Sequence, residues 1–172
     1  MNFVKKIIEK EIDDSIIYTK YVKGIIIDIY SAYAHIFIYE KNMNQLKAAI
    51  INFDNIKKKL KIEDTISSYA LIEKVKGDLW FYNKDYKAAI SYYERALNIF
   101  EKNNPKIAPV FFNIGCAYFF FGDKYKAKEY LNRSINEYNN IIIQKNIYGF
   151  TPDVNSINIK IYNAKKLLNL IN

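Results

Sequence analysis

The 172-residue sequence has few residues that bend or cross-link a chain: five glycines, three prolines and one cysteine. A β-sandwich or β-barrel needs a turn about every 8–12 residues, and glycine and proline supply many of these turns, so their scarcity disfavours both architectures. A single cysteine excludes a disulfide framework and a cysteine-based zinc site, which fits a reducing compartment. The 51% hydrophobic content excludes intrinsic disorder.

Arginine is also scarce, although the chain is basic. There are 26 basic and 18 acidic residues, a net charge of +8, yet only Arg95 and Arg133 are arginines. Specific base recognition depends strongly on arginine, and single-strand binding needs aromatic side chains beside a basic groove. The charge excess is spread along the chain and forms no basic arm. The sequence therefore argues against a nucleic-acid partner and predicts a lysine-rich, solvated surface.

A long hydrophobic run is missing as well. The most apolar stretch, residues 24–39, is interrupted by Asp28 and His35 and is shorter than the roughly 20 residues that span a bilayer. Near the N-terminus, acidic residues come before a hydrophobic segment reaches signal-peptide length. We therefore expect a cytoplasmic protein without membrane association.

Apolar residues recur at three- and four-residue spacing almost throughout, which predicts an all-α fold. Asp85 and Asp123 have the character of N-caps, and Thr151 before Pro152 predicts another helix start. The connections between the predicted helices are short. Neighbouring helices are therefore expected to pair as antiparallel hairpins.

The sequence also repeats itself: residues 77–100 align with residues 115–138. The aligned pairs are Gly77 with Gly115, Trp80 with Tyr118, Asp85 with Asp123, Tyr93 with Leu131, and Ala96 with Ser134. Glycine inside a helix costs about 1 kcal/mol relative to alanine, so Gly77 and Gly115 need a reason. We expect each to mark a close helix crossing, with Ala89 and Ala127 as the small residues on the opposing helices.

This order of small, aromatic and alanine positions resembles the tetratricopeptide repeat family. Residues 70–138 match the pattern twice, and residues 30–60 resemble a degenerate first copy that keeps Ala49 and Phe53. The resemblance implies an all-α, right-handed superhelical array of antiparallel helical hairpins. Glu73 and Lys76 stand where the family prefers large apolar residues, so we expect the start of that helix to be rotated or frayed.

The predicted organisation is a single domain over residues 1–172. It consists of an N-terminal helix (1–23), a degenerate repeat (24–61), two repeats (62–104 and 105–145) and a C-terminal capping helix (150–172).

The resemblance implies a non-catalytic scaffold that binds a protein or peptide through the concave face of its first helices. The predicted partner-binding residues are Lys74, Asp78, Phe81, Phe112, Asn113, Cys116, Phe119 and Phe120. Some family members hold a terminal carboxylate with lysine and asparagine on this face. Here Lys74 and Asn113 match two such positions, but Asp78 lies between them and would repel the ligand, so that mode is disfavoured.

The sequence offers little for catalysis. His35 is the sole histidine and Cys116 the sole cysteine, they lie far apart in sequence, and no phosphate-binding loop or metal-ligand spacing occurs. We therefore predict no enzymatic activity, no cofactor, no metal and no small-molecule substrate.

Three alternatives remain open at the sequence level. The chain resembles the peptide-binding sensor part of peptide-responsive transcription regulators, and it resembles small secretion chaperones. It also fits a structural homo-oligomer, for example a homodimer joined through the aromatic surface. A further open point is whether the C-terminal segment fills that surface.

Overall fold

The computed structural model describes residues 29–30, 32, 36–38, 40–60, 69–100, 104, 106–148 and 153–171. Every regular element in these ranges is an α-helix, as predicted. The chain forms two compact units, residues 1–72 and 73–172, which are described separately. The predicted helix over residues 1–23, His35 and the predicted helix start at Thr151 lie outside the described ranges.

In the first unit, α3 (Met43–Leu60) follows a turn at residues 40–42. The Asn42 side-chain oxygen accepts a hydrogen bond from the backbone N–H of Gln45 at 3.2 Å, which caps the new helix. On the buried face of α3, the Phe53 ring packs against Tyr30 and Tyr69, with centroids 5.7 and 6.0 Å apart. An aromatic core therefore anchors this unit.

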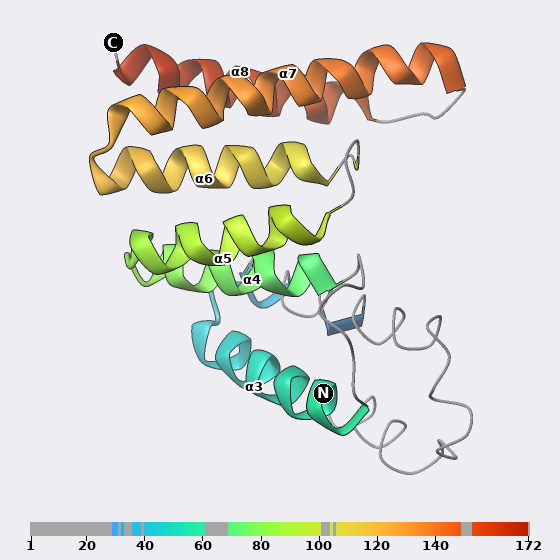
Figure 1. Cartoon of the computed structure of the whole chain (residues 1–172), viewed down its shortest axis with the longest axis vertical. Helices are drawn as coiled ribbons and strands as arrows, with labels where there is room; N and C mark the ends of the chain where they lie inside the picture. The colour runs from blue at the N-terminus through green and yellow to red at the C-terminus, as the bar shows by residue number, and fades with distance from the viewer. Residues whose placement is uncertain are drawn as a thin grey trace. The chain divides into compact units, whose positions relative to one another are not determined.

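The second unit is an array of antiparallel helices. They are α4 (Tyr69–Tyr82, of which residues 73–82 belong here), α5 (Tyr86–Ile99), α6 (Ile107–Phe121), α7 (Lys124–Tyr148) and α8 (Val154–Ile171). Helix α6 packs between α5 and α7, and α8 packs against α7 (Figure 1). The predicted hairpin array is therefore confirmed.

The turns form where the sequence predicts them. The Asp85 and Asp123 carboxylates each accept a backbone N–H three residues ahead at 3.0 Å, which caps α5 and α7. Gly122 ends α6 with a φ of 96°, a left-handed conformation that glycine adopts without strain. At the start of α8, Asp153 accepts the N–H groups of Asn155 and Ser156 at 3.1 and 3.2 Å.

The two interior glycines mark close helix crossings, as predicted. A Cβ atom at Gly77 would lie 2.4 Å from the Tyr93 ring, and one at Gly115 would lie 2.8 Å from Leu131 Cγ. The side chains against the glycines are thus the large residues at the aligned positions. Ala89 and Ala127 are fully buried but are not the nearest neighbours.

The expected fraying at Glu73 is wrong. Helix α4 continues through this position, and the Glu73 side chain is buried. Its two carboxylate oxygens lie 3.4 Å from Lys76 Nζ and 3.4 Å from Arg95 Nε. Paired cations offset the cost of burying the charge, so this position accepts a glutamate in place of an apolar residue.

Candidate protein-binding surface

The eight predicted binding residues all lie on α4 and α6. Lys74, Asp78 and Phe81 belong to α4; Phe112, Asn113, Cys116, Phe119 and Phe120 belong to α6. The two helices are joined at two points along their length. One is a hydrogen bond between Asp78 and Asn113, and the other is a ring contact between Phe81 and Phe120, with centroids 5.8 Å apart.

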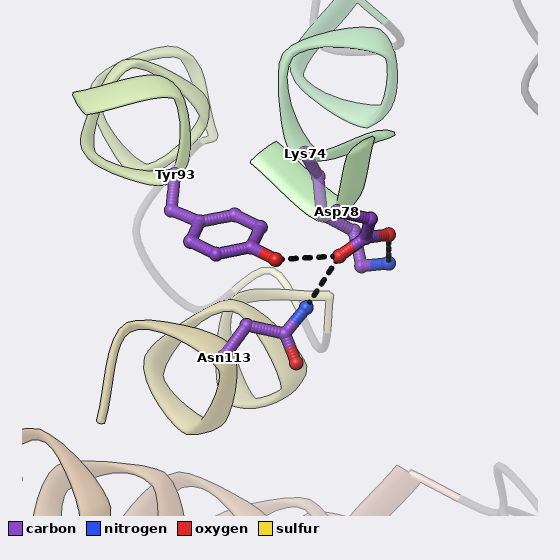
Figure 2. Close-up of polar contacts among 4 residues, drawn as sticks. All are labelled: Lys74, Asp78, Tyr93 and Asn113. Carbon is purple, nitrogen blue, oxygen red and sulfur yellow. Dashed lines mark hydrogen bonds and ion pairs between the residues drawn. The ribbon is translucent and has the colours of Figure 1, made fainter. Parts of the chain in front are cut away.

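The polar contact, here called the polar junction, consists of Lys74, Asp78, Tyr93 and Asn113 (Figure 2). Asp78 Oδ1 accepts hydrogen bonds from the Tyr93 hydroxyl at 2.8 Å and from Asn113 Nδ2 at 2.9 Å. Asp78 Oδ2 pairs with Lys74 Nζ at 2.7 Å. Asp78 is only 8% exposed, so these three donors replace the water that its charge would otherwise require.

The junction bears directly on ligand chemistry. Lys74 and Asn113 are the two donors that would hold a terminal carboxylate, and both point to the protein's own carboxylate (Figure 2). The expectation was that Asp78 would repel such a ligand. In addition, Asp78 already engages both donors.

The sequence did not predict that Tyr93 makes a polar contact. Its position in the repeat indicated only that its ring packs between the helices. Burial, followed by the charge of Asp78, raises the pKa of the Tyr93 hydroxyl above its usual value, so it remains a donor. A signal was available in the repeat alignment. Tyr93 and Asp78 are replaced together, by Leu131 and Cys116, in the second repeat.

The second contact is an aromatic cluster formed by Phe81, Tyr82, Tyr86, Phe119 and Phe120. Phe120 stacks on Tyr86 with centroids 5.5 Å apart, and its ring also meets Phe81 and Phe119. Phe81 and Phe119 occupy equivalent positions of the two repeats, so the repeat alignment predicts that these two rings lie side by side. Instead, Phe120 is the α6 ring that reaches the preceding hairpin.

Phe112, Cys116 and Phe119 follow one another at i, i+4 and i+7 on α6, and all three are half-buried. We call them the α6 stripe. Burial raises the pKa of the Cys116 thiol to about 12, so it is protonated at neutral pH and is a poor nucleophile. Among the described residues, no group of His, Cys, Asp and Glu side chains is arranged to hold a metal ion.

The C-terminal helix packs at the other end of α6. Ile157 and Ile161 of α8 join Ala108 and Tyr138 in one core cluster, and Ala108 lies in the first turn of α6. Phe119 and Phe120 lie in its last turn, where the Phe120 side chain is exposed. In this core cluster, α8 therefore contacts the first turn of α6 and not its last turn.

A family model for the tetratricopeptide repeat matches residues 70–139, which span α4, α5, α6 and the first part of α7. Domains of this family are generally protein-interaction modules and are typically non-catalytic. A comparison with curated proteins finds no match to this chain. No helix in the described part of the chain is long and apolar enough to cross a membrane.

Proposed function

We propose that the tetratricopeptide repeats at residues 70–139 make this chain a non-catalytic scaffold that binds another protein or a peptide through the surface of α4 and α6. The observation that carries the proposal is the α6 stripe. Phe112 and Phe119 are only half-buried and share one face of α6, whereas Val110, Ile114 and Ala117 of the same helix are fully buried. Large apolar side chains aligned along one face provide contacts for the apolar side chains of a partner.

The surface is also held in a fixed arrangement before binding. The hydrogen bond between Asp78 and Asn113 joins α4 to α6, and Tyr93 ties Asp78 to α5. A partner would not have to order these side chains, so less binding free energy is lost on association. This rigidity supports recognition by a preformed surface.

The charges at the polar junction support a particular kind of ligand. Lys74 is paired with Asp78 at 2.7 Å, so this cation is already neutralised. We therefore propose that the surface recognises apolar side chains within a polypeptide segment and does not depend on a terminal carboxylate.

The test is affinity capture with the tagged full chain in an extract of the source cells, followed by identification of the bound proteins. The test variant is Phe112→Ser with Phe119→Ser, which removes the ring surface of the α6 stripe. The matched control is Ile159→Ser on α8, a similarly apolar residue that is exposed and lies outside α4 and α6. Phe81 is left unchanged because its ring contacts three others, Tyr82, Tyr86 and Phe120. The ring contact given for Phe119 is with Phe120.

We expect the parent and the Ile159→Ser control to recover the same partner, and the double variant to recover at least about tenfold less, which corresponds to about 1.4 kcal/mol. Thermal melts of all three chains show whether folding is retained. Equal recovery by a folded double variant would contradict the proposal. The proposal would also be contradicted if the partner bound only a homodimer of this chain and did not bind the monomer.

A further inference from the structure

A second apolar surface lies at the turn end of the hairpins. Four large side chains, here called the turn-end patch, are exposed there: Tyr82 (51%), Phe120 (55%), Phe121 (57%) and Tyr125 (82%). Tyr82 ends α4, Phe120 and Phe121 end α6, and Tyr125 lies in the first turn of α7. Because successive helices alternate in direction, these helix ends lie at the same side of the array (Figure 1).

Part of the patch is rigidly supported from beneath. Phe120 stacks on Tyr86 at 5.5 Å with an interplanar angle of 20°, and Tyr82 packs edge-on against Phe81 at 6.4 Å. A change of the Tyr82 or Phe120 side-chain conformation would break these ring contacts. Several such rings in one region exceed the scattered single apolar residues that are normal on a surface.

Around the patch, the lysines outnumber the carboxylates. The two turns contribute the exposed lysines Lys84, Lys87 and Lys124. The carboxylates in the same turns, Asp85 and Asp123, accept backbone N–H groups as helix caps. One oxygen of each carboxylate is thus held by the backbone, whereas the three lysines stand at exposed positions and leave a net positive charge.

We infer that the turn-end patch is a docking surface for an acidic segment of a partner protein that presents apolar side chains. The rings would take the apolar side chains, and the lysines would pair with the carboxylates around them. The inference rests on the proposed function and adds a second contact region to it, distinct from the α6 stripe.

Two other occupants fit less well. A second copy of the chain would bring lysine-rich turns together, and each chain carries a net charge of +8, so like charges would oppose that contact. An anionic lipid surface would satisfy the lysines as well. The residues of the patch, however, belong to a segment that matches a protein-interaction family, which favours a polypeptide.

The test uses the full chain and three labelled synthetic peptides of equal length, titrated by fluorescence anisotropy. The first combines glutamate with leucine and phenylalanine, the second replaces the leucine and phenylalanine with serine, and the third replaces the glutamate with lysine. We expect the first to bind at least about tenfold more tightly than either of the others. Its affinity should fall as salt rises from about 0.1 M to about 0.5 M, because salt shortens the Debye length.

The site is tested with variants of exposed residues. Phe121→Ser with Tyr125→Ser should weaken binding of the first peptide at least about tenfold, and Lys84→Gln with Lys124→Gln about fivefold. The matched controls are Ile159→Ser on α8 and Lys106→Gln at the opposite end of α6, both at exposed positions. Both controls should keep the parental Kd.

If the double aromatic variant fails to fold, Tyr125→Ser alone replaces it, because this side chain is 82% exposed and contributes little to packing. Equal affinity for the patch variants and the controls would overturn the inference, as would preference for the lysine peptide. Binding to phosphatidylserine vesicles without binding to the acidic peptide would also overturn it, as would dimerisation lost in the patch variants.

To separate the two proposals, Phe112→Ser with Phe119→Ser and the patch variants are compared both in the affinity capture and in the peptide titration. If that variant loses its captured partner while the patch variants bind the acidic peptide like the controls, the proposed function holds and the docking surface is wrong. If the patch variants lose peptide affinity while the stripe variant keeps its captured partner, the docking surface holds and the assignment of binding to the α6 stripe is wrong.

Discussion

The hairpins α4–α5 and α6–α7 share a repeat spacing, and in each of them an arginine of the second helix contacts a residue of the first helix. We call this contact the arginine clasp; its chemistry differs between the two hairpins. In the first, Arg95 lies 3.4 Å from the buried carboxylate of Glu73. In the second, the aligned Arg133 lies over the ring of the aligned Phe111, 4.3 Å from its centroid. The only two arginines of the chain therefore bridge the same two positions, once by an ion pair and once by a cation–π contact.

The glycine crossing shows the same kind of substitution. Gly77 faces Tyr93, whose hydroxyl donates to Asp78, whereas Gly115 faces Leu131 and the position of Asp78 is Cys116. The two members of each contact change together. The comparison teaches that glycines and helix caps set the hairpin geometry, and that the packed contacts accept polar or apolar chemistry provided that both partners match.

The largest expected loss of stability comes from truncating the two side chains that pack against Gly77 and Gly115. Tyr93→Ala should lower the free energy of unfolding by about 3–5 kcal/mol, because it leaves a cavity and removes a hydrogen bond to buried Asp78. Leu131→Ala leaves only a cavity, so its cost should lie within about 2–5 kcal/mol and below that of Tyr93→Ala. Urea denaturation measures both. The comparison fails if Leu131→Ala is the more damaging change.

Removing each arginine should separate the two clasps. Arg95→Ala leaves the buried Glu73 carboxylate with Lys76 alone, and because the Arg95 side chain is half-exposed we expect a loss of about 1–3 kcal/mol. Arg133→Ala removes cation–π contacts with Phe111 and Tyr130 and a half-exposed ion pair with Glu129, and because all of these are solvent-screened, about 0.5–1 kcal/mol should be lost. Equal losses in chemical denaturation would show that the two arginines do not act differently.

The Tyr93 crossing should also respond to alkali, which the Leu131 crossing cannot do because leucine does not ionise. Unfolded tyrosine ionises near 10.0, whereas burial and Asp78 raise the pKa of Tyr93, so above pH 10 only the unfolded state loses this proton. Stability should then fall with rising pH, by up to about 1.4 kcal/mol per unit from this one group.

Tyr93→Phe should remove that part of the slope, while the exposed control Tyr162→Phe keeps it. The measurement is the free energy of unfolding at pH 9, 10 and 11. Parallel curves for the parent and Tyr93→Phe would contradict the assignment.

The smallest effect is expected from exchanging one clasp for the other. Glu73→Phe with Lys76→Ile places the residues of the second hairpin, Phe111 and Ile114, at the aligned positions of the first. Replacing a buried ion pair by packed apolar groups is often neutral or stabilising, so the stability should stay within about 1 kcal/mol of the parent. A loss above about 3 kcal/mol would show that the two clasps are not interchangeable.

The hairpins were predictable from the sequence because their determinants are local. Asp85, Asp123 and Gly122 each act within a few residues, by capping or by a left-handed φ, and Gly77 and Gly115 reveal the crossings by their cost inside a helix. The tetratricopeptide family match over residues 70–139 agrees with the resemblance drawn from these positions.

The contacts between helices were less predictable. The charge of Glu73 contradicted the repeat pattern when it was judged by position alone, because its partner Arg95 lies on the next helix. One helical residue turns the side chain by about 100°, which decides whether Phe119 or Phe120 faces Phe81. The bond between Tyr93 and Asp78 depends on atomic positions that residue type does not specify.

The central claim, that the surface of α4 and α6 binds a polypeptide, is tested most directly by site-specific photo-crosslinking. A photoreactive phenylalanine analogue replaces Phe112 or Phe119 in the tagged full chain, or Ile159 on α8 as the control, and crosslinked products are identified by mass spectrometry after irradiation in the source cells. We predict that positions 112 and 119 yield the same protein and that position 159 does not. Equal crosslinking from position 159, or no product from positions 112 and 119 in a folded chain, would contradict the claim.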